Sequence, residues 1–403
     1  MRVLVLSMTT WGEMGNWLSG RALTQAVARC RPDWEVTQQP VDRLLPALAE
    51  VGARIRRVTM DSRTPAERST GYGRIMQDLL ADYPTGMEEG APVTPAVRQQ
   101  LDQLGAAIEK QAPDMIVGTK GVICRLAIAS TNNRIPVVNY VTNHGHFQFA
   151  VHNCPGAAAH LTRMDAAGAF LQARWGYPQD RVACVGYLVG GADAGPSDAG
   201  GTVDAPAADR LHVVVVSNRG GGEYVDILQR LLEHRRAPGG TFIALNDPAL
   251  CAAARERIEG SGQSDRWSVL EKLDHEDFVR MLASRHERGA IALVTKASPN
   301  SIMEAVYLGI PMFLLRSGLP MEDWSCDVVT GGGFGAVADT VDGLWPAIAE
   351  SIDTPERLTA ISAREQEYAA RALDQTAVVA RILAALERAG SRQRAADLVN
   401  RAG

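Results

Sequence analysis

The stretch from Gly289 to Ala338 decides the fold and reads GAIALVTKASPNSIMEAVYLGIPMFLLRSGLPMEDWSCDVVTGGGFGAVA. Within it, Ala290–Val294 is an apolar run that is long enough for a buried strand and too short for a helix. A helical segment follows over Ser301–Leu308, and a second apolar strand follows over Met312–Leu315. The pattern therefore predicts a strand–helix–strand unit, which a polar loop and a glycine cluster continue at the same edge of a sheet.

The predicted helix has clear signals at both ends. Ser298 suits the N-cap, Pro299 suits the first turn, and Gly309 closes the helix. A helix that begins where a strand ends presents unpaired backbone N–H groups and a positive dipole end to an anion, typically phosphate. Glu304, one turn inside the helix, brings a carboxylate within reach of a sugar hydroxyl pair. An ordinary βαβ unit that binds nothing is the alternative at this point.

The same stretch resembles the nucleotide-sugar signature of the monogalactosyldiacylglycerol synthases and of the related lipid-intermediate N-acetylglucosaminyltransferase of peptidoglycan assembly. That family surrounds a UDP-sugar with a Lys-Ala-Gly-Pro turn, a helix containing a Glu, a Gly-x-Pro strand entry and a later Gln-Glu pair. Ser298 replaces the Gly of the turn, and Met321-Glu322 stands where the Gln-Glu pair is expected. The matching residues are Lys296, Ala297, Pro299, Glu304 and Gly309–Pro311.

The resemblance implies the α/β GT-B architecture, in which two Rossmann-like, doubly wound domains face a central cleft. We expect residues 1–187 to form an acceptor-binding domain and residues 210–365 to form a UDP-sugar-binding domain. Residues 188–209 are rich in Gly, Ala, Asp and Pro without apolar periodicity, which is typical of a flexible linker. Residues 366–403 are expected to be a C-terminal helix and polar tail.

The donor site is expected in the second domain. Its first strand, His212–Val216, is followed by a glycine loop that lets the backbone approach a diphosphate. The candidate donor-binding residues, carried by this loop, the later strand ends and the resemblance, are Ser217, Arg219, Gly220, Gly221, Asn246, Lys272, Leu273, Lys296, Ser298, Pro299, Asn300, Ser301, Glu304, Met321 and Glu322.

The first domain is expected to supply the acceptor side and a general base. The family's loop His aligns with Asn16, and its strand-end Asp aligns with Asn143, so the base must come from elsewhere. An imidazole with a pKa near ~6.5 suits proton abstraction at neutral pH, so His144 and His146 rank ahead of Glu13. The candidate acceptor-side residues are Trp11, Gly15, Asn16, Thr142 and Asn143.

Composition excludes several classes of function. The 403 residues suffice for two domains, and the net charge of −5 argues against a nucleic-acid groove. The six cysteines form no CxxC pair, which favours free thiols in a reducing cytosol and a cytoplasmic location. The opening MRVLVLSMTT lacks the apolar core of a signal peptide, and no apolar run approaches a membrane span.

The sequence thus predicts an inverting, metal-independent glycosyltransferase, since no Asp-x-Asp pair follows a strand to hold Mg²⁺. A UDP-sugar is the co-substrate, and no further cofactor is expected. The charged stretch Val51–Val97 lacks an apolar docking stripe, which favours a small soluble acceptor, such as a nucleoside or another natural-product scaffold, over a lipid. A diacylglycerol glycosyltransferase, a nucleotide-sugar epimerase or hydrolase of the same fold, and a non-enzymatic binding module remain alternatives. The sugar, the acceptor and the oligomeric state stay open.

Overall fold

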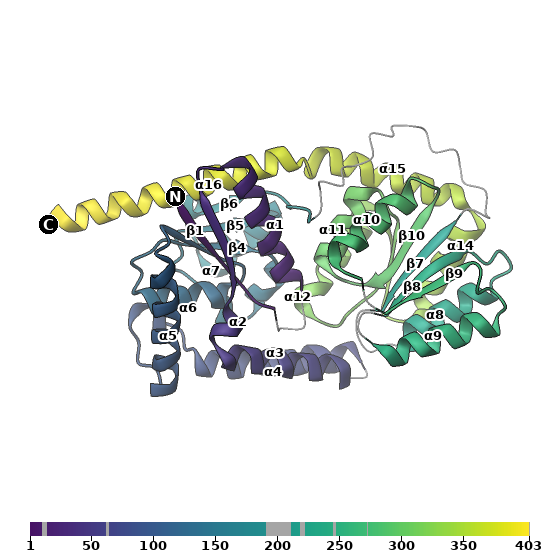
Figure 1. Ribbon diagram of the computed structural model, residues 1–403, viewed down its shortest axis with the longest axis horizontal. Helices are drawn as coiled ribbons and strands as arrows, with labels where there is room; N and C mark the ends of the chain where they lie inside the picture. The colour runs from purple at the N-terminus through teal and green to yellow at the C-terminus, as the bar shows by residue number, and fades with distance from the viewer. Residues whose placement is uncertain are drawn as a thin grey trace. The chain divides into compact units, whose positions relative to one another are not determined.

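The chain divides into two compact units (Figure 1). The computed structural model describes residues 1–9, 14–61, 64–190, 211–217, 222–244, 247–271 and 273–402; of residues 14, 59–61, 144, 146 and 393–402 it describes only the backbone. Unit 1 contains residues 1–58, 69–190 and 374–403, and unit 2 contains residues 59–68 and 191–373.

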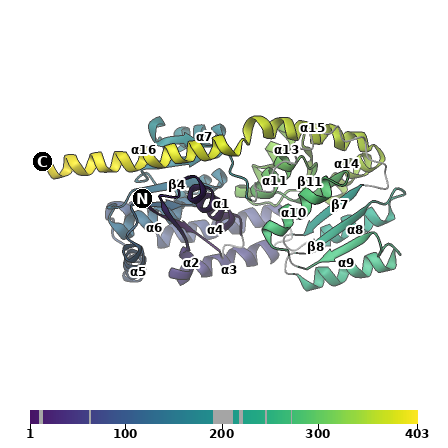
Figure 2. The ribbon, with the colours of Figure 1, turned by 45° about the horizontal axis from the view of Figure 1, so that its top comes forward.

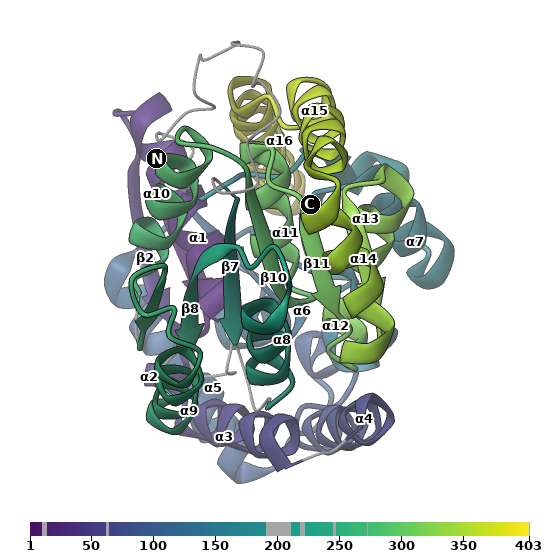
Figure 3. The same ribbon diagram turned by 90° about the vertical axis from the view of Figure 1, so that its right-hand side faces the viewer.

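Unit 2 is built on a six-stranded sheet in the order β12-β11-β10-β7-β8-β9, in which every neighbouring pair is parallel. Figure 3 shows the central strands side by side. The first strand of the unit, β7, pairs on one side with β8 and on the other with β10, far along the chain. The strands are β7 (His212–Ser217), β8 (Gly239–Ala244), β9 (Trp267–Leu270), β10 (Ile291–Lys296), β11 (Met312–Leu315) and β12 (Gly335–Ala338).

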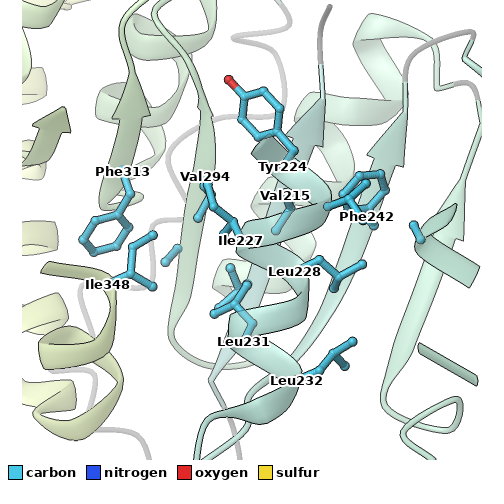
Figure 4. Packing of buried hydrophobic residues seen from close by; sticks show 14 of the residues in the cluster. Val215, Tyr224, Ile227, Leu228, Leu231, Leu232, Phe242, Val294, Phe313 and Ile348 are labelled. Atoms are coloured by element: carbon cyan, nitrogen blue, oxygen red, sulfur yellow. The ribbon is translucent and has the colours of Figure 1, made fainter. Parts of the chain in front are cut away.

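Helices cover both faces of this sheet, as a parallel sheet with apolar side chains on both faces requires. Its central strands β7 and β10 are almost continuously apolar and buried. On one face α8 packs its Ile227, Leu228 and Leu231 against Val215 of β7 and Val294 of β10 (Figure 4). Each such aliphatic side chain contributes about 1.5–3 kcal/mol when it is buried.

The helices α9 and α14 extend this core, and α15 adds Leu358 to it. Helix α11 contacts both α10 and α15. The helices of unit 2 are α8 (Gly222–Glu233), α9 (Pro248–Gly260), α10 (His275–His286), α11 (Pro299–Leu308), α12 (Pro320–Asp323), α13 (Cys326–Gly332), α14 (Val341–Asp353) and α15 (Pro355–Ala372).

Unit 1 holds a second six-stranded parallel sheet, in the order β2-β1-β3-β4-β5-β6. Its strands are β1 (Arg2–Ser7), β2 (Glu35–Pro40), β3 (Met115–Gly118), β4 (Val137–Val141), β5 (Ala159–Thr162) and β6 (Val182–Cys184). Its helices are α1 (Met14–Cys30), α2 (Val41–Leu44), α3 (Pro46–Asp61), α4 (Pro65–Asp82), α5 (Pro95–Gln111), α6 (Gly121–Thr131), α7 (Asp165–Trp175) and α16 (Gln375–Ala402), and its short 3₁₀ helices are η1 (Met87–Glu89), η2 (His144–Gln148), η3 (Ala150–His152) and η4 (Gln179–Arg181). The end of α3 and the start of α4, within residues 59–68, belong to unit 2.

The last helix returns to the first unit. Val378, Ile382 and Leu386 of α16 are buried in one cluster with residues of α1 and of strands β1, β3, β4 and β5. Figure 2 shows this long yellow helix running along unit 1. The part of α16 from Val378 to Ala389 therefore packs in the core of unit 1, whereas the sequence predicts a separate C-terminal helix and polar tail over residues 366–403. The backbone of α16 stays helical as far as Ala402.

The predicted α/β class with two doubly wound sheets is confirmed. Within the opening stretch, the expected strand Met312–Leu315 has the expected bounds, and Gly309 ends α11 with a φ of 71°. The glycine cluster divides, because Gly331 and Gly332 lie in α13 whereas Gly335 begins β12. The charged stretch Val51–Val97, for which the sequence predicts only the lack of an apolar docking stripe, contains most of α3 and all of α4.

Gly331 and Gly335 of this cluster differ in the space available for a side chain, and this difference gives a matched test of the β11–β12 pairing. Gly335 has a φ of 151°, and a Cβ there would lie 1.7 Å from the carbonyl oxygen of Met312. Gly331 has no heavy atom within 4 Å of its Cβ position. We expect Gly335→Ala to destabilise unit 2 by ~3 kcal/mol through strain and strand separation. Gly331→Ala should change stability by less than ~1 kcal/mol. Calorimetric unfolding of the two variants measures this, and equal melting temperatures would contradict the close approach.

Candidate functional site

Two helices of unit 2 begin at the same edge of its sheet. Strand β7 ends at Ser217 before α8, and β10 ends at Lys296 before α11. Since β8 lies beyond β7 and β11 lies beyond β10, the chain leaves the two paired strands in opposite directions. Ligands of open α/β sheets bind at such a switch point, outside the carboxyl ends of the strands. The hydroxyl of Ser217 is buried there and has no hydrogen-bond partner among the residues described.

The N-cap residue of α11 supplies no side-chain cap. Ser298 is the N-cap and Pro299 the first residue, yet the Ser298 side chain makes no capping hydrogen bond. Instead, the hydroxyl of Ser301 donates to that of Ser298 at 3.4 Å. Asn300 and Ser301 are partly exposed in this first turn. The ten-residue helix therefore keeps a positive end that accommodates an anion.

Glu304 is the most informative side chain of the site. Its side chain is 3% exposed, and its Oε1 lies 2.7 Å from Nε2 of His275, the first residue of α10. Its other oxygen, Oε2, is buried and has no hydrogen-bond partner in the part of the chain that the structure describes. A buried polar atom left without a partner costs about 1–3 kcal/mol, and more when it is charged. The unsatisfied oxygen indicates that a further donor completes this carboxylate.

A buried ion pair lies at the carboxyl end of β10. Lys296 Nζ lies 2.6 Å from both carboxylate oxygens of Glu322, and both side chains are largely buried. Glu322 belongs to the short helix α12, where Met321 is also buried and its carbonyl accepts a hydrogen bond from the Trp324 indole at 2.9 Å.

In unit 1 the sheet order changes direction between β1 and β3, and predicted residues meet above that edge. The hydroxyl of Thr142 donates to Oδ1 of Asn16 at 2.6 Å and lies 3.0 Å from the carbonyl oxygen of Thr119. Asn143 accepts a hydrogen bond from the amide of Gly145 at 3.1 Å, so its side chain holds the loop that starts η2. The structure thus brings Asn16 and Thr142 together although 126 positions separate them.

The remaining predicted residues divide into placed and undescribed ones. Gly15 lies in the first turn of α1, where its carbonyl accepts from the Ser19 hydroxyl at 2.7 Å. Leu273 precedes Asp274, the N-cap of α10. His144 and His146 lie in η2, and only their backbone is described. Outside the described residues lie Trp11, Glu13, Arg219, Gly220, Gly221, Asn246 and Lys272.

Sequence reasoning did not place two residues of these edges in the site. His275 contacts Glu304 from another helix, and no spacing pattern links them. Lys120 is buried at the N-cap of α6, directly beyond β3. The position of Lys120, a charged residue shortly after an apolar strand, is the sequence signal that could have identified it as a site residue.

Two absences hold for the described part of the chain. No three side chains of His, Cys, Asp or Glu cluster there in a way that could hold a metal ion. No helix in that part combines the length and apolarity needed to cross a membrane.

Known proteins resemble this chain in structure alone. No protein-family model and no curated sequence matches it. A candidate UDP-N-acetylglucosamine 2-epimerase from Listeria monocytogenes matches with a TM-score of 0.58 at 15% identity, over 96% of each chain. A glycosyltransferase from Rickettsia africae matches with a TM-score of 0.55 at 9% identity, over 96% of this chain and 98% of that one. HepE from Anabaena, solved in complex with UDP and glucose, matches with a TM-score of 0.55 at 15% identity, over 96% and 99%.

At these identities the likeness establishes the fold. The chain is an α/β protein of the GT-B type with two Rossmann-like units, as the sequence predicts. The narrower resemblance to monogalactosyldiacylglycerol synthases stays a prediction.

The Lys296–Glu322 pair gives a test of the site's architecture. Replacing one member leaves an uncompensated buried charge, so Lys296→Met should destabilise unit 2 by ~3 kcal/mol. Adding Glu322→Gln to that variant should recover much of the loss. The control is Arg280→Met, which removes the exposed partner of Asp277 and should change stability by less than ~1 kcal/mol. Thermal unfolding of these three variants and of Glu322→Gln alone measures the coupling, and single effects that add up in the double variant would show that the two groups do not interact.

Proposed function

We propose that this protein is an inverting glycosyltransferase that moves a sugar from a UDP-sugar to a small soluble acceptor. In this reaction the acceptor oxygen forms a bond to the anomeric carbon as a base takes the acceptor's proton. The bond from that carbon to the diphosphate oxygen breaks, and UDP leaves with the electron pair. The reaction has two needs, a base for the acceptor and stabilisation of the departing diphosphate.

The observation that carries the proposal is the half-satisfied carboxylate of Glu304. His275 holds one oxygen, and the other is buried without a described partner, beside the uncapped start of α11. A nucleotide ribose offers two adjacent hydroxyl groups as donors, and its phosphates are the anions that suit a helix N-terminus. Diol and diphosphate are joined in one molecule, so a nucleoside diphosphate satisfies both features together.

The sheet edge also supports stabilisation of the leaving group without a metal ion. Helices α8 and α11 both begin at this edge, next to the paired strands β7 and β10. Their positive ends favour the charge that develops on the departing diphosphate. In the proposed mechanism these groups take the place of a divalent cation, and no cofactor besides the UDP-sugar takes part.

The acceptor side is proposed to lie in unit 1, around Asn16 and Thr142, with His144 or His146 as the base. A soluble acceptor, such as a nucleoside or another natural-product scaffold, agrees with the surface of helices α3 and α4. There Arg54 forms an ion pair with Asp78, and Arg56 and Arg57 are exposed. Charged, ion-paired helix surfaces favour water over the apolar contact that a lipid acceptor requires.

Calorimetric titration of UDP tests the donor site. We expect UDP to bind the wild-type protein, and Glu304→Ala to weaken binding by ~1–3 kcal/mol through loss of a charged hydrogen bond. Glu256→Ala, on the exposed side of α9, is the matched control and should bind UDP like the wild type. Equal UDP affinity in Glu304→Ala would remove that residue from the ribose site, and absence of any uridine nucleotide binding would refute the donor class.

Turnover with saturating donor tests the base. We expect His144→Ala or His146→Ala to lower kcat by ~10²–10⁴-fold, as removal of a general base does. Glu13→Gln is the comparison, and a loss of this size in that variant alone would assign the base to the carboxylate. Release of UDP is measured with and without acceptor. UDP release that proceeds equally without any acceptor would instead establish a nucleotide-sugar hydrolase, and conversion of the donor to another UDP-sugar without UDP release would establish an epimerase.

A further inference from the structure

A pocket lies at the carboxyl ends of β10, β11 and β12, and every residue that lines it belongs to unit 2. Lys296, Leu315 and Thr340 line it at or beyond the three strand ends, and Tyr224 of α8 lines it from the side. The pocket therefore adjoins the Glu304 site through β10, whose last residue is Lys296 and whose following helix carries Glu304.

Three cations and the three carboxylates of Glu223, Glu322 and Asp339 line this pocket, and two of the cations are paired with carboxylates. Lys296 is paired with Glu322 at 2.6 Å, and Nε of Arg316 lies 3.4 Å from Asp339. The third is Arg68, near the start of α4. Among the residues that the structure describes, no carboxylate lies within ion-pair distance of Arg68.

Arg68 also keeps an unused donor. Its Nη1 donates to the carbonyl oxygen of Ser317 at 3.1 Å, whereas its Nε is buried and lacks a hydrogen-bond partner in the described chain. A guanidinium offers five N–H donors in a planar fork that matches the oxygens of a carboxylate or phosphate. A buried N–H without an acceptor is costly, so an oxyanion in the pocket would remove that cost.

The surroundings hold Arg68 in place. The carboxylate of Asp323 accepts hydrogen bonds from the amides of Ser317 and Gly318 at 2.8 and 2.9 Å, which fixes the loop after β11. Gly318 has a φ of 76°, and a Cβ there would lie 2.4 Å from Cα of Pro65. The first residue of α4 is thus packed directly on this loop. Arg68 follows three residues later, on the same side of the helix.

We propose that this pocket binds an oxyanion of the substrate, with Arg68 as its charged donor and a determinant of substrate specificity. This inference rests on the proposed function, because that function supplies two sources of such a group: the diphosphate of the nucleotide sugar, or the carboxylate of a uronate sugar carried by it. Lys296 and Arg316 are paired with Glu322 and Asp339 and shape the pocket, and Arg68 provides the cationic donor that has no such partner among the described residues.

Isothermal titration with inorganic pyrophosphate, UDP, UDP-glucose and UDP-glucuronate tests this. Arg68→Met keeps the length of the side chain and removes its charge, so we expect it to weaken oxyanion binding by about 10-fold or more. Arg68→Lys should restore part of the affinity, because it keeps the charge without the fork. Arg280→Met, an exposed arginine on α10, is the matched control, and melting temperatures verify that all variants are folded.

The pattern across the probes distinguishes the two sources. An equal loss for all four assigns the diphosphate to Arg68, and a loss for UDP-glucuronate alone assigns the sugar carboxylate. Unchanged affinity of folded Arg68→Met for all four overturns the inference, while UDP binding that depends on Glu304 would still stand for the proposed function. Pyrophosphate binding that depends on Arg68 but gains nothing from uridine would keep the inference and refute the proposed donor. Wild-type protein that binds none of the probes refutes both.

Discussion

The pairing of β7 with β10 is the constraint on which unit 2 depends. These two strands are neighbours in the sheet, although β8 and β9 lie between them in the chain. A parallel sheet needs helices on both faces, so the chain must leave β7 and β10 toward opposite sides. Because β7 and β10 are parallel, they end at the same edge of the sheet, and the helices that follow them, α8 and α11, both begin there.

Buried polar groups at this edge are the reason that we assign the donor site to it. The edge of the sheet places Ser217, Lys296 and Glu304 where little water reaches them, and a buried polar group needs a partner. Lys296 has its partner in Glu322, and one oxygen of Glu304 has His275. The hydroxyl of Ser217 and the other oxygen of Glu304 have none among the described residues. A folded protein retains such unsatisfied groups at a cost in stability, which is typical of a binding site and unusual for a core.

The substitutions relative to the resembled family have a physical consequence in the structure. Ser298 stands where that family has Gly, and its hydroxyl contacts Ser301 and makes no capping hydrogen bond. Asn143 stands where the family has Asp, and its amide oxygen supports the backbone of Gly145. Both positions have a role in shaping a loop, and at Asn143 the carboxylate of the family is absent.

By itself the sequence determined the elements that depend on neighbouring residues. The apolar runs that became β7, β10 and β11 and the glycine that ends α11 are visible in short windows, because strand length, burial pattern and backbone conformation are local properties. The predicted βαβ unit and its exposed helix start follow from these signals.

Only the tertiary structure decided which distant residues meet. The contact of His275 with Glu304, the hydrogen bond from Arg68 to Ser317 and the burial of Ile382 in unit 1 join positions that no periodic pattern connects. Helices α3 and α4 were not predicted from the sequence, because their apolar positions are few and separated by charged residues. Local windows record propensity, whereas these contacts arise when separate elements pack together, and that packing is set by the whole chain.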